Sequence, residues 1–371
     1  MDINTSKVIV RDICRIMEEY APLCLQESYD NAGLVIGNRD QVVRKILVSI
    51  DVTEAVVEEA IENQCEMIIS HHPLIFRGLR KITGGSSVER AVINAIKHEV
   101  AIYASHTNLD KAYLGVSWKM AEKLDLTDLQ VLSPIADGLL KLVTFVPESH
   151  WESLKKALFS AGAGTIGAYD SCSFSVLGTG TFRATESCHP YVGETGIEHF
   201  EKEMRLEVIV PDCRRNEVIE ALLQEHPYEE PVYDFYKLSN DWPQVGLGVV
   251  GNLPEEREEL DVLQTIKQTF GCRCIRHTPL LGRKVRRIAL CGGSGAEFLP
   301  MAIRSKAQIY VTADCKYHEF FNAEDQIILA DIGHFESEQF TKELIVDCIK
   351  KKIPTFAFVF SKTNTNPINY L

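Results

Sequence analysis

The chain has 371 residues, a formal net charge of -13 and an isoelectric point near 5.4. A single core usually stops growing at roughly 250–300 residues, so the length predicts two domains. The excess of acidic residues argues against a surface that neutralises nucleic-acid phosphates, and we do not expect a nucleic-acid partner. The longest apolar runs are as short as strands and fall well below the roughly 18 residues of a membrane span, so no membrane partner is expected either.

Cysteine usage indicates a reducing compartment. Eleven cysteines are scattered from Cys14 to Cys348 without the spacing of a disulfide framework. The first residues contain no apolar stretch typical of a secretion signal. We therefore expect a cytoplasmic protein.

The first 125 or so residues alternate between helical periodicity and short buried-type strands. The expected elements are a helix over 7–19, a strand over 46–50, a helix over 53–63, a strand over 65–70, a helix over 87–97 and a strand over 100–105. This alternation is typical of a layered α/β domain.

The pattern changes after about residue 128. The expected elements are a strand over 140–146, a helix over 151–161, polar and aromatic alternation over 173–185, a strand over 205–210, a helix over 216–225 and a strand over 232–238. This order predicts a small ferredoxin-like α+β domain over 129–242, inserted into the larger one.

From about residue 246 the first pattern returns. The expected elements are strands over 249–251, 287–291, 309–312, 327–330 and 356–360, and helices over 260–270, 296–305 and 336–350. The sequence therefore predicts a discontinuous α/β domain built from residues 1–128 and 243–371.

Residues of the kinds that bind metals follow three of these strands. His71 and His72 come directly after the apolar run that ends at Ser70, His106 and Asp110 follow a second strand, and His334 and Glu338 follow a third; the strands are Met67–Ser70, Ala101–Ala104 and Ile327–Ala330. Ligand sites of open α/β sheets lie at the carboxyl ends of the strands, so the three clusters predict one shared site.

The spacing and types of these residues favour divalent metal ions. His334 and Glu338 are four residues apart at the start of a helix, which places them on one helix face. Adjacent His71 and His72 would point to opposite sides of a regular strand, so either each serves a different ion or the strand has turned. Asp110 could bridge two ions, or it could instead cap the helix that follows. Imidazole and carboxylate donors without cysteine suit zinc, and also iron, manganese, nickel or cobalt.

Two further segments are candidates for substrate binding or proton transfer. Asp314 and His318 follow the strand over 309–312 and could orient a substrate or shuttle a proton; the alternative is a capping residue and a surface histidine. The run Gly292–Gly295 lies between a strand and a helix. Its N–H groups could hold an anion, although a tight turn explains the glycines equally well.

Several motifs in a fixed order resemble one known family. They are Ser28–Leu34, Ile69–Leu74, Ser105–Asp110, Cys291–Gly295 and Gly333–Glu338 in the outer segments, with His226–Pro231 in the middle segment. Together they resemble the Nif-three-like dinuclear-metal family, which is often labelled GTP cyclohydrolase I type 2. The resemblance covers essentially the whole chain, with one departure at Tyr29, where a tryptophan is expected.

The resemblance implies roles for residues across the chain. The ligands of two divalent ions, with zinc favoured, would be His71, His72, Asp110, His334 and Glu338. His106 would be a further ligand or a catalytic neighbour, and a nucleotide-like substrate would meet Tyr29, Asp30, Asn31, Gly292, Gly293 and Ser294. The family's members are toroidal homo-hexamers, and the inserted domain resembles modules of the PII or CutA type.

The family label implies a reaction, and three hypotheses follow. The first is hydrolytic opening of the guanine imidazole ring of GTP with release of formate, in which His106 stabilises charge and Asp314 or His318 moves a proton. The second is a dinuclear phosphoesterase, because two bridged ions suit attack on phosphate. The third is a metal-carrying or regulatory ring whose inserted domain senses a small ligand or a metal.

Overall fold

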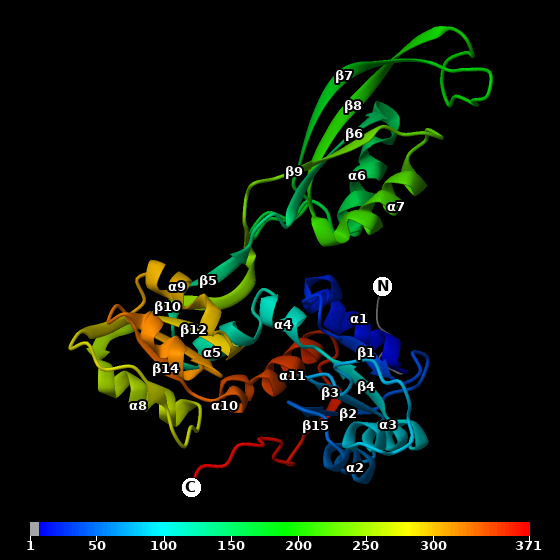
Figure 1. Ribbon diagram of the computed structural model, residues 1–371. Helices are drawn as coiled ribbons and strands as arrows, with labels where there is room; N and C mark the ends of the chain where they lie inside the picture. The colour runs from blue at the N-terminus through cyan, green and yellow to red at the C-terminus, as the bar shows by residue number, and fades with distance from the viewer. Residues whose placement is uncertain (1–6) are drawn as a thin grey trace. The chain divides into compact units, whose positions relative to one another are not determined.

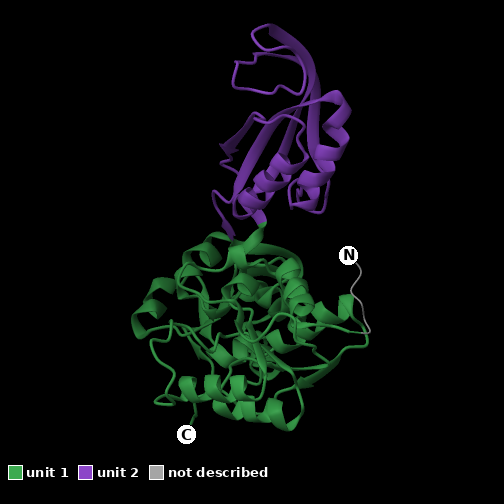
Figure 2. Cartoon of the chain, turned by 90° about the vertical axis from the view of Figure 1, so that its right-hand side faces the viewer, with its two compact units in different colours: residues 1–133, 244–371 green, residues 134–243 purple. Residues whose placement is uncertain are grey.

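The computed structural model describes residues 7–371, which form two compact units. The first unit combines the two outer segments, up to Ser133 and from Gln244 onward, and the second is Pro134–Pro243 (Figure 2). The boundaries expected at 128/129 and 242/243 fall inside strand β5 (Thr127–Ile135) and at the start of β10 (Trp242–Glu258). These two strands carry the chain out of the first unit and back into it.

Within residues 7–371, the first unit contains two sheets. The first has the order β1-β4-β3-β2-β15, and its strands are β1 (Gly33–Ile36), β2 (Lys45–Ser49), β3 (Met67–Ser70), β4 (Ala101–Ala104) and β15 (Ala357–Phe360). The neighbours from β4 to β15 are parallel, and β1 is antiparallel to β4. The central strands are therefore short, continuous apolar runs, as expected of parallel strands buried on both faces.

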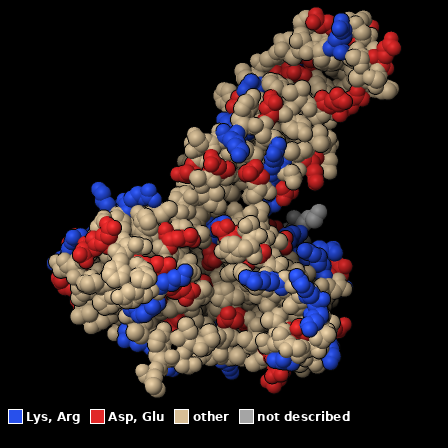
Figure 3. All heavy atoms as spheres, viewed as in Figure 1, with Lys and Arg blue, Asp and Glu red and all other residues tan. Residues whose placement is uncertain are grey.

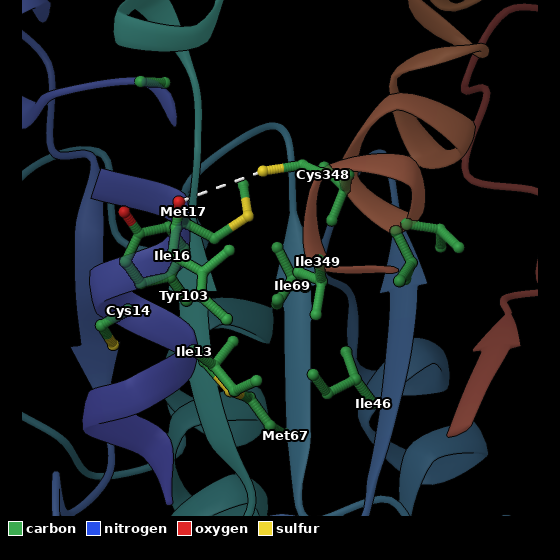
Figure 4. Close-up of a cluster of buried hydrophobic side chains, with 14 of the residues drawn as sticks. Ile13, Cys14, Ile16, Met17, Ile46, Met67, Ile69, Tyr103, Cys348 and Ile349 are labelled. Atoms are coloured by element: carbon green, nitrogen blue, oxygen red, sulfur yellow. Dashed lines mark hydrogen bonds between the residues drawn. The ribbon is translucent and has the colours of Figure 1, made fainter. Parts of the chain in front are cut away.

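Helices cover both faces of this first sheet (Figure 1). On one face lie α1 (Val10–Tyr20) and α11 (Thr341–Lys352), and on the other lie α2 (Glu54–Glu62) and α3 (Ser87–Lys97). Alternate residues of one strand serve the two layers, since Ile46 packs toward α1 and α11 while Leu47 packs toward α2 and α3. Figure 4 shows the first of these layers, where the Cys348 thiol of α11 meets the Ile16 carbonyl of α1 at 4.0 Å.

The second sheet of this unit has the order β11-β14-β13-β12-β10-β5. Its strands besides β5 and β10 are β11 (Arg276–His277), β12 (Lys284–Ser294), β13 (Ile309–Ala313) and β14 (Ile328–Asp331). The three strands β12, β13 and β14 are parallel. One face packs against α5 (Val116–Lys123) and α8 (Glu259–Thr269), and the other packs against α9 (Leu299–Arg304).

The second unit is an antiparallel sheet with two helices on one face (Figure 2). Its strand order is β7-β8-β6-β9, and the strands are β6 (Leu139–Pro147), β7 (Ser173–Arg183), β8 (Glu198–Pro211) and β9 (Tyr233–Lys237). The helices are α6 (Trp151–Ser160) and α7 (Arg215–Glu225), which pack on Leu142, Leu206 and Val208. The order of elements agrees with the α+β arrangement expected for this segment.

Three local features differ from the expected elements. The helix expected over 336–350 is two helices, α10 (His334–Glu338) and α11, and the helix expected over 296–305 begins as a 3₁₀ turn before α9. Strand β1 and the helices α4 (Thr107–Lys111) and α5 were not expected. The 3₁₀ turn before α9 is η4 (Ala296–Phe298), and the other 3₁₀ segments within residues 7–371 are η1 (Leu23–Leu25), η2 (Glu148–His150), η3 (Asp212–Arg214) and η5 (Tyr317–Ala323).

Among residues 7–371, no helix has both the length and the apolar character that a membrane crossing requires.

Candidate metal centre

Both sheets of the first unit contribute side chains to one cluster. His71 and His72 follow β3, and Asp110 lies on α4 directly after β4. His334 and Glu338 lie on α10, which follows β14 of the second sheet. The structure thus brings together the five residues that the sequence singled out as metal ligands, at the carboxyl ends of parallel strands.

Glu338 lies at the centre of the cluster. Its Oε2 atom is 3.0 Å from His72 Nε2 and 3.2 Å from His334 Nε2. Its Oε1 atom is 3.6 Å from His71 Nε2, which is also 3.6 Å from Asp110 Oδ1. Each oxygen of Glu338 therefore faces a different set of donors. In this geometry the residue that lies between the two sets is Glu338, whereas the sequence had suggested Asp110 as the bridge.

In each of the four histidines at the cluster, the Nδ1 atom forms a hydrogen bond with an oxygen atom. His72 Nδ1 lies 2.7 Å from Asp51 Oδ1, His334 Nδ1 lies 2.7 Å from Asp314 Oδ2, and His71 Nδ1 lies 2.8 Å from the carbonyl oxygen of Ser105. His106 Nδ1 lies 2.7 Å from Asp30 Oδ1. Because a carbonyl or carboxylate oxygen only accepts, each Nδ1 donates, and a neutral ring then presents the lone pair of Nε2. This arrangement of oxygen, imidazole and metal is typical of histidine ligands.

The convergence of acceptors fits a cation. His72 Nε2 and His334 Nε2 are 3.3 Å apart, and both face the same oxygen of Glu338. Within residues 7–371, the buried atoms His71 Nε2 and Asp110 Oδ1 have no hydrogen-bond partner. Buried polar atoms are rarely left unpaired, so a positive charge is needed here. His71, His72 and Glu338 together meet the geometry of a metal-binding group.

The pKa shifts of the residues in the cluster also indicate that it favours a positive charge. Burial lowers the pKa of His72, but hydrogen bonds to Asp51 and Glu338 outweigh it and raise the pKa to about 10. Burial also lowers the pKa of His334, and hydrogen bonds to Asp314 and Glu338 raise it to about 11. Burial raises the pKa of Glu338, but the neighbouring imidazoles hold it well below its ordinary value. In the metal-free protein, protons occupy the positions that cations would take.

The glycine run Gly292–Gly295 lies at the end of β12 and makes contacts within the first unit. Gly292 and Gly293 belong to β12 itself, and their N–H groups donate to Ser117 Oγ at 3.2 Å and Ser337 Oγ at 2.9 Å. These donors are therefore not free for a phosphate, and Ser294 pairs with β13. A methyl group at Gly293 would lie 2.4 Å from Glu338 Oε1, so the glycine makes room for the central carboxylate.

Asp30 and Asn31 both form hydrogen bonds within the protein, and their binding of a substrate stays a prediction. Asp30 accepts hydrogen bonds from His106 and from the N–H of Thr107, and Asn31 Nδ2 donates to the carbonyl of Ile75 at 2.6 Å. The side chain of Tyr29 is exposed, with 62% of the residue accessible. Its ring lies 6.2 Å from that of Phe76, which in turn lies 6.2 Å from His106.

Asp314 and His318, either of which was expected to orient a substrate or move a proton, lie in different surroundings. The hydrogen bond to His334 lowers the pKa of Asp314, which makes this residue an orienting partner of a ligand. His318 is exposed on η5, and its ring contacts Tyr317 and Phe321. Its expected role as a proton shuttle has no support from these contacts.

Two residues beside the cluster, Asp51 and Phe76, were not predicted from the sequence. Asp51 follows β2 directly, so the strand-end signal that identified His71 applied to it as well. Its second oxygen accepts from Thr365 Oγ1 at 2.5 Å. Phe76 has no comparable signal, because only the folded loop brings its ring beside His106.

Comparisons with known proteins agree with this fold. Residues 8–367 match the family model described as Duf34/NIF3 (NGG1p interacting factor 3). A Halalkalibacterium halodurans protein named "GTP cyclohydrolase 1 type 2 homolog" is 37% identical, over 97% of this chain and 98% of that protein. A Bacillus subtilis protein of the same name is 36% identical, over 97% and 98%. A solved Bacillus cereus structure described as related to NIF3 has a TM-score of 0.81 at 36% identity, covering 98% of this chain and 99% of that one. The chain therefore belongs to the Duf34/NIF3 family.

Proposed function

We propose that this protein is a dinuclear metal-dependent hydrolase that opens the purine ring of GTP and releases formate. The observation that carries the proposal is the position of Glu338, whose Oε2 faces the nitrogens of His72 and His334 while its Oε1 faces His71 Nε2, which in turn lies beside Asp110. The names of the two relatives support the substrate, since both are called homologs of a GTP cyclohydrolase.

The donors divide into two sets that share Glu338. His72 and His334 would hold one ion, and His71 and Asp110 would hold the other. Zinc is favoured by the mixture of imidazole and carboxylate, with iron, manganese, nickel and cobalt as the other candidates. Two ions in this position would supply an activated water and would neutralise charge that develops on the substrate.

The neighbouring residues can position the substrate and move a proton. Asp30 fixes His106 through Nδ1, and the ring centroid of His106 lies 5.3 Å from that of His71 and 5.2 Å from that of His72. His106 Nε2 is therefore available to exchange a proton with a bound substrate. The exposed rings of Tyr29 and Phe76 offer flat apolar faces next to His106, which suit stacking of a purine.

The charge pattern supports a small molecule as the substrate. On the face that Figure 3 shows, acidic side chains are interspersed with basic ones, and a nucleic acid would require clustered basic side chains. We further propose a homo-hexamer, which the family motifs support and light scattering would test.

The test is a formate assay on metal-loaded protein. Protein purified without chelators and loaded with zinc or manganese should release formate from GTP. Glu338→Gln should reduce the rate by at least ~100-fold, because the shared carboxylate is lost. Glu336→Gln, on the same short helix, should keep the rate. Fully loaded wild-type protein that releases no formate would refute the substrate and favour a non-enzymatic metal-binding role.

A further inference from the structure

The second unit contains a cavity of its own, remote in sequence from the metal ligands. It has a volume of about 580 Å³, within the range of small-molecule sites. Leu206 and Val208 of β8 pack on the helices, so Glu203 and Arg205, which are odd-numbered, face the other side of the sheet. Both of these residues line the cavity, which therefore lies on the helix-free face.

Glu203 is the unusual residue of this cavity. Only 8% of it is exposed, and its Oε1 atom accepts a hydrogen bond from the hydroxyl of Tyr228 at 2.9 Å. Within residues 7–371, Glu203 forms no ion pair, and the Tyr228 hydroxyl is the one donor to its carboxylate, through Oε1. The nearby Arg205 is engaged elsewhere, with Glu207 at 3.0 Å. A buried carboxylate usually has a positive partner, and this one has none from the protein.

The strand beside Glu203 leaves space for this carboxylate. Gly178 of β7 pairs with Glu203 in the sheet, and Gly180 lies two residues farther along on the same face. A methyl group at Gly180 would lie 2.1 Å from Glu203 Oε2. Because neither glycine has a side chain, the carboxylate stays open toward the cavity.

Aromatic rings form the walls around the carboxylate. The Tyr228 ring lies 6.1 Å from that of Phe182 and 6.2 Å from that of Tyr191, and all three line the cavity. His226 fixes this arrangement, since its Nδ1 accepts from the N–H of Tyr228 at 3.1 Å while its Nε2 donates to the carbonyl of Phe145 at 2.9 Å. Aromatic faces attract cations, especially where water is excluded.

We propose that this cavity binds a small organic cation, a primary ammonium group carried on an apolar body. The ammonium would donate to Glu203 Oε2 and lie against the rings of Tyr228, Phe182 and Tyr191. A hard metal ion is a poorer occupant, because it needs several oxygen ligands and the aromatic walls supply none apart from hydroxyls. The charged side chains that line the cavity are the carboxylates of Glu203, Glu229 and Glu230 and the guanidinium groups of Arg183 and Arg205. Their sum is negative, which favours a cation.

The experiment compares an amine with its neutral analogue on the full-length protein. Phenethylamine, tyramine and hexylamine are titrated by calorimetry at pH 7, with 2-phenylethanol as the uncharged counterpart of phenethylamine. We expect at least one amine to bind, and the alcohol to bind at least ~10-fold more weakly than phenethylamine. Glu203→Gln should weaken amine binding at least ~10-fold. Glu201→Gln, on the same strand and face but paired with His199, should leave it unchanged.

Three results would overturn the proposal. One is the absence of binding by all three amines at millimolar concentration, and another is equal binding of amine and alcohol. The third is a change in the mass of the assembly on Glu203→Gln without amine binding to the wild type, which would mean that a cation from another copy fills the cavity. Tyr228→Phe is a second variant, which keeps the ring and removes only the hydroxyl. It allows the proposal to be tested even if Glu203→Gln does not fold.

Discussion

The hydrogen bond between Asp51 and His72 makes Asp51 a positioning residue for the metal centre. Asp51→Asn should weaken metal binding by roughly 10–100-fold, because an amide no longer fixes the proton on Nδ1 and the lone pair on Nε2. Competition with a chromophoric chelator measures the affinity. Asp40→Asn, which removes only an exposed ion pair with Arg11, should leave the affinity unchanged. Equal affinities for wild type and Asp51→Asn would contradict this role.

Thr365 does not contact His72 but supports Asp51, since the Thr365 hydroxyl donates to the second oxygen of Asp51. Thr365→Val should weaken metal binding by less than Asp51→Asn, because the carboxylate remains but loses one donor. Thr365→Ser should restore the affinity, since it keeps the hydroxyl. Failure of serine to restore the affinity that valine loses would show that packing, and not the hydrogen bond, is responsible.

At the scale of elements, the junction between β12 and α10 depends on a glycine. Gly293 and Gly271 have similar positive φ values of 63° and 61°, but only Gly293 approaches another residue, with its added methyl group 2.4 Å from Glu338 Oε1. Gly271→Ala should therefore cost only the roughly 1–2 kcal/mol of a left-handed backbone. Gly293→Ala should lower stability further and also reduce metal content. Elemental analysis and urea unfolding of both variants measure the difference, and normal metal content in Gly293→Ala would contradict it.

The start of α3 should make stability depend on pH. Ser86 and Glu89 form a capping pair, and hydrogen bonds from the N–H groups of Thr83 and Gly85 lower the pKa of Glu89 to about 2. A lowered folded-state pKa stabilises the fold above the unfolded value of about 4.5, and this contribution is lost as the pH falls toward 2. Glu89→Gln should therefore be less stable than wild type at pH 7, by a gap that narrows at pH 3. A gap of equal size at both pH values would refute the effect.

The elements also show what the sequence could and could not predict. Parallel strands buried on both faces are recognisable as apolar runs, so the ligands that directly follow β3, β4 and β14 could be found in advance. The roles of Gly292 and Gly293 could not, because the hydroxyls of Ser117 and Ser337 that accept from them come from distant segments. The role of Thr365 could not be predicted either, because only the fold brings this distant C-terminal segment to Asp51.

At the scale of the whole molecule, the second unit is inserted at two neighbouring strands. β5 and β10 lie side by side in one sheet, and Asn252 Nδ2 of β10 donates to Asp128 Oδ2 of β5 at 3.1 Å. Replacing residues 134–243 by a short turn should therefore leave the first unit folded, with its metal content unchanged. Circular dichroism and elemental analysis of this deletion test the expectation, and a protein that is folded but metal-free would contradict it.

The central claim is that side chains from two sheets hold two divalent cations, and anomalous diffraction tests it most directly. Crystals of protein purified without chelators and supplied with zinc should show two anomalous peaks per chain, one beside His72 and His334 and the other beside His71 and Asp110, with Glu338 between them. Crystals at saturating zinc that show no peak within the cluster would contradict the account.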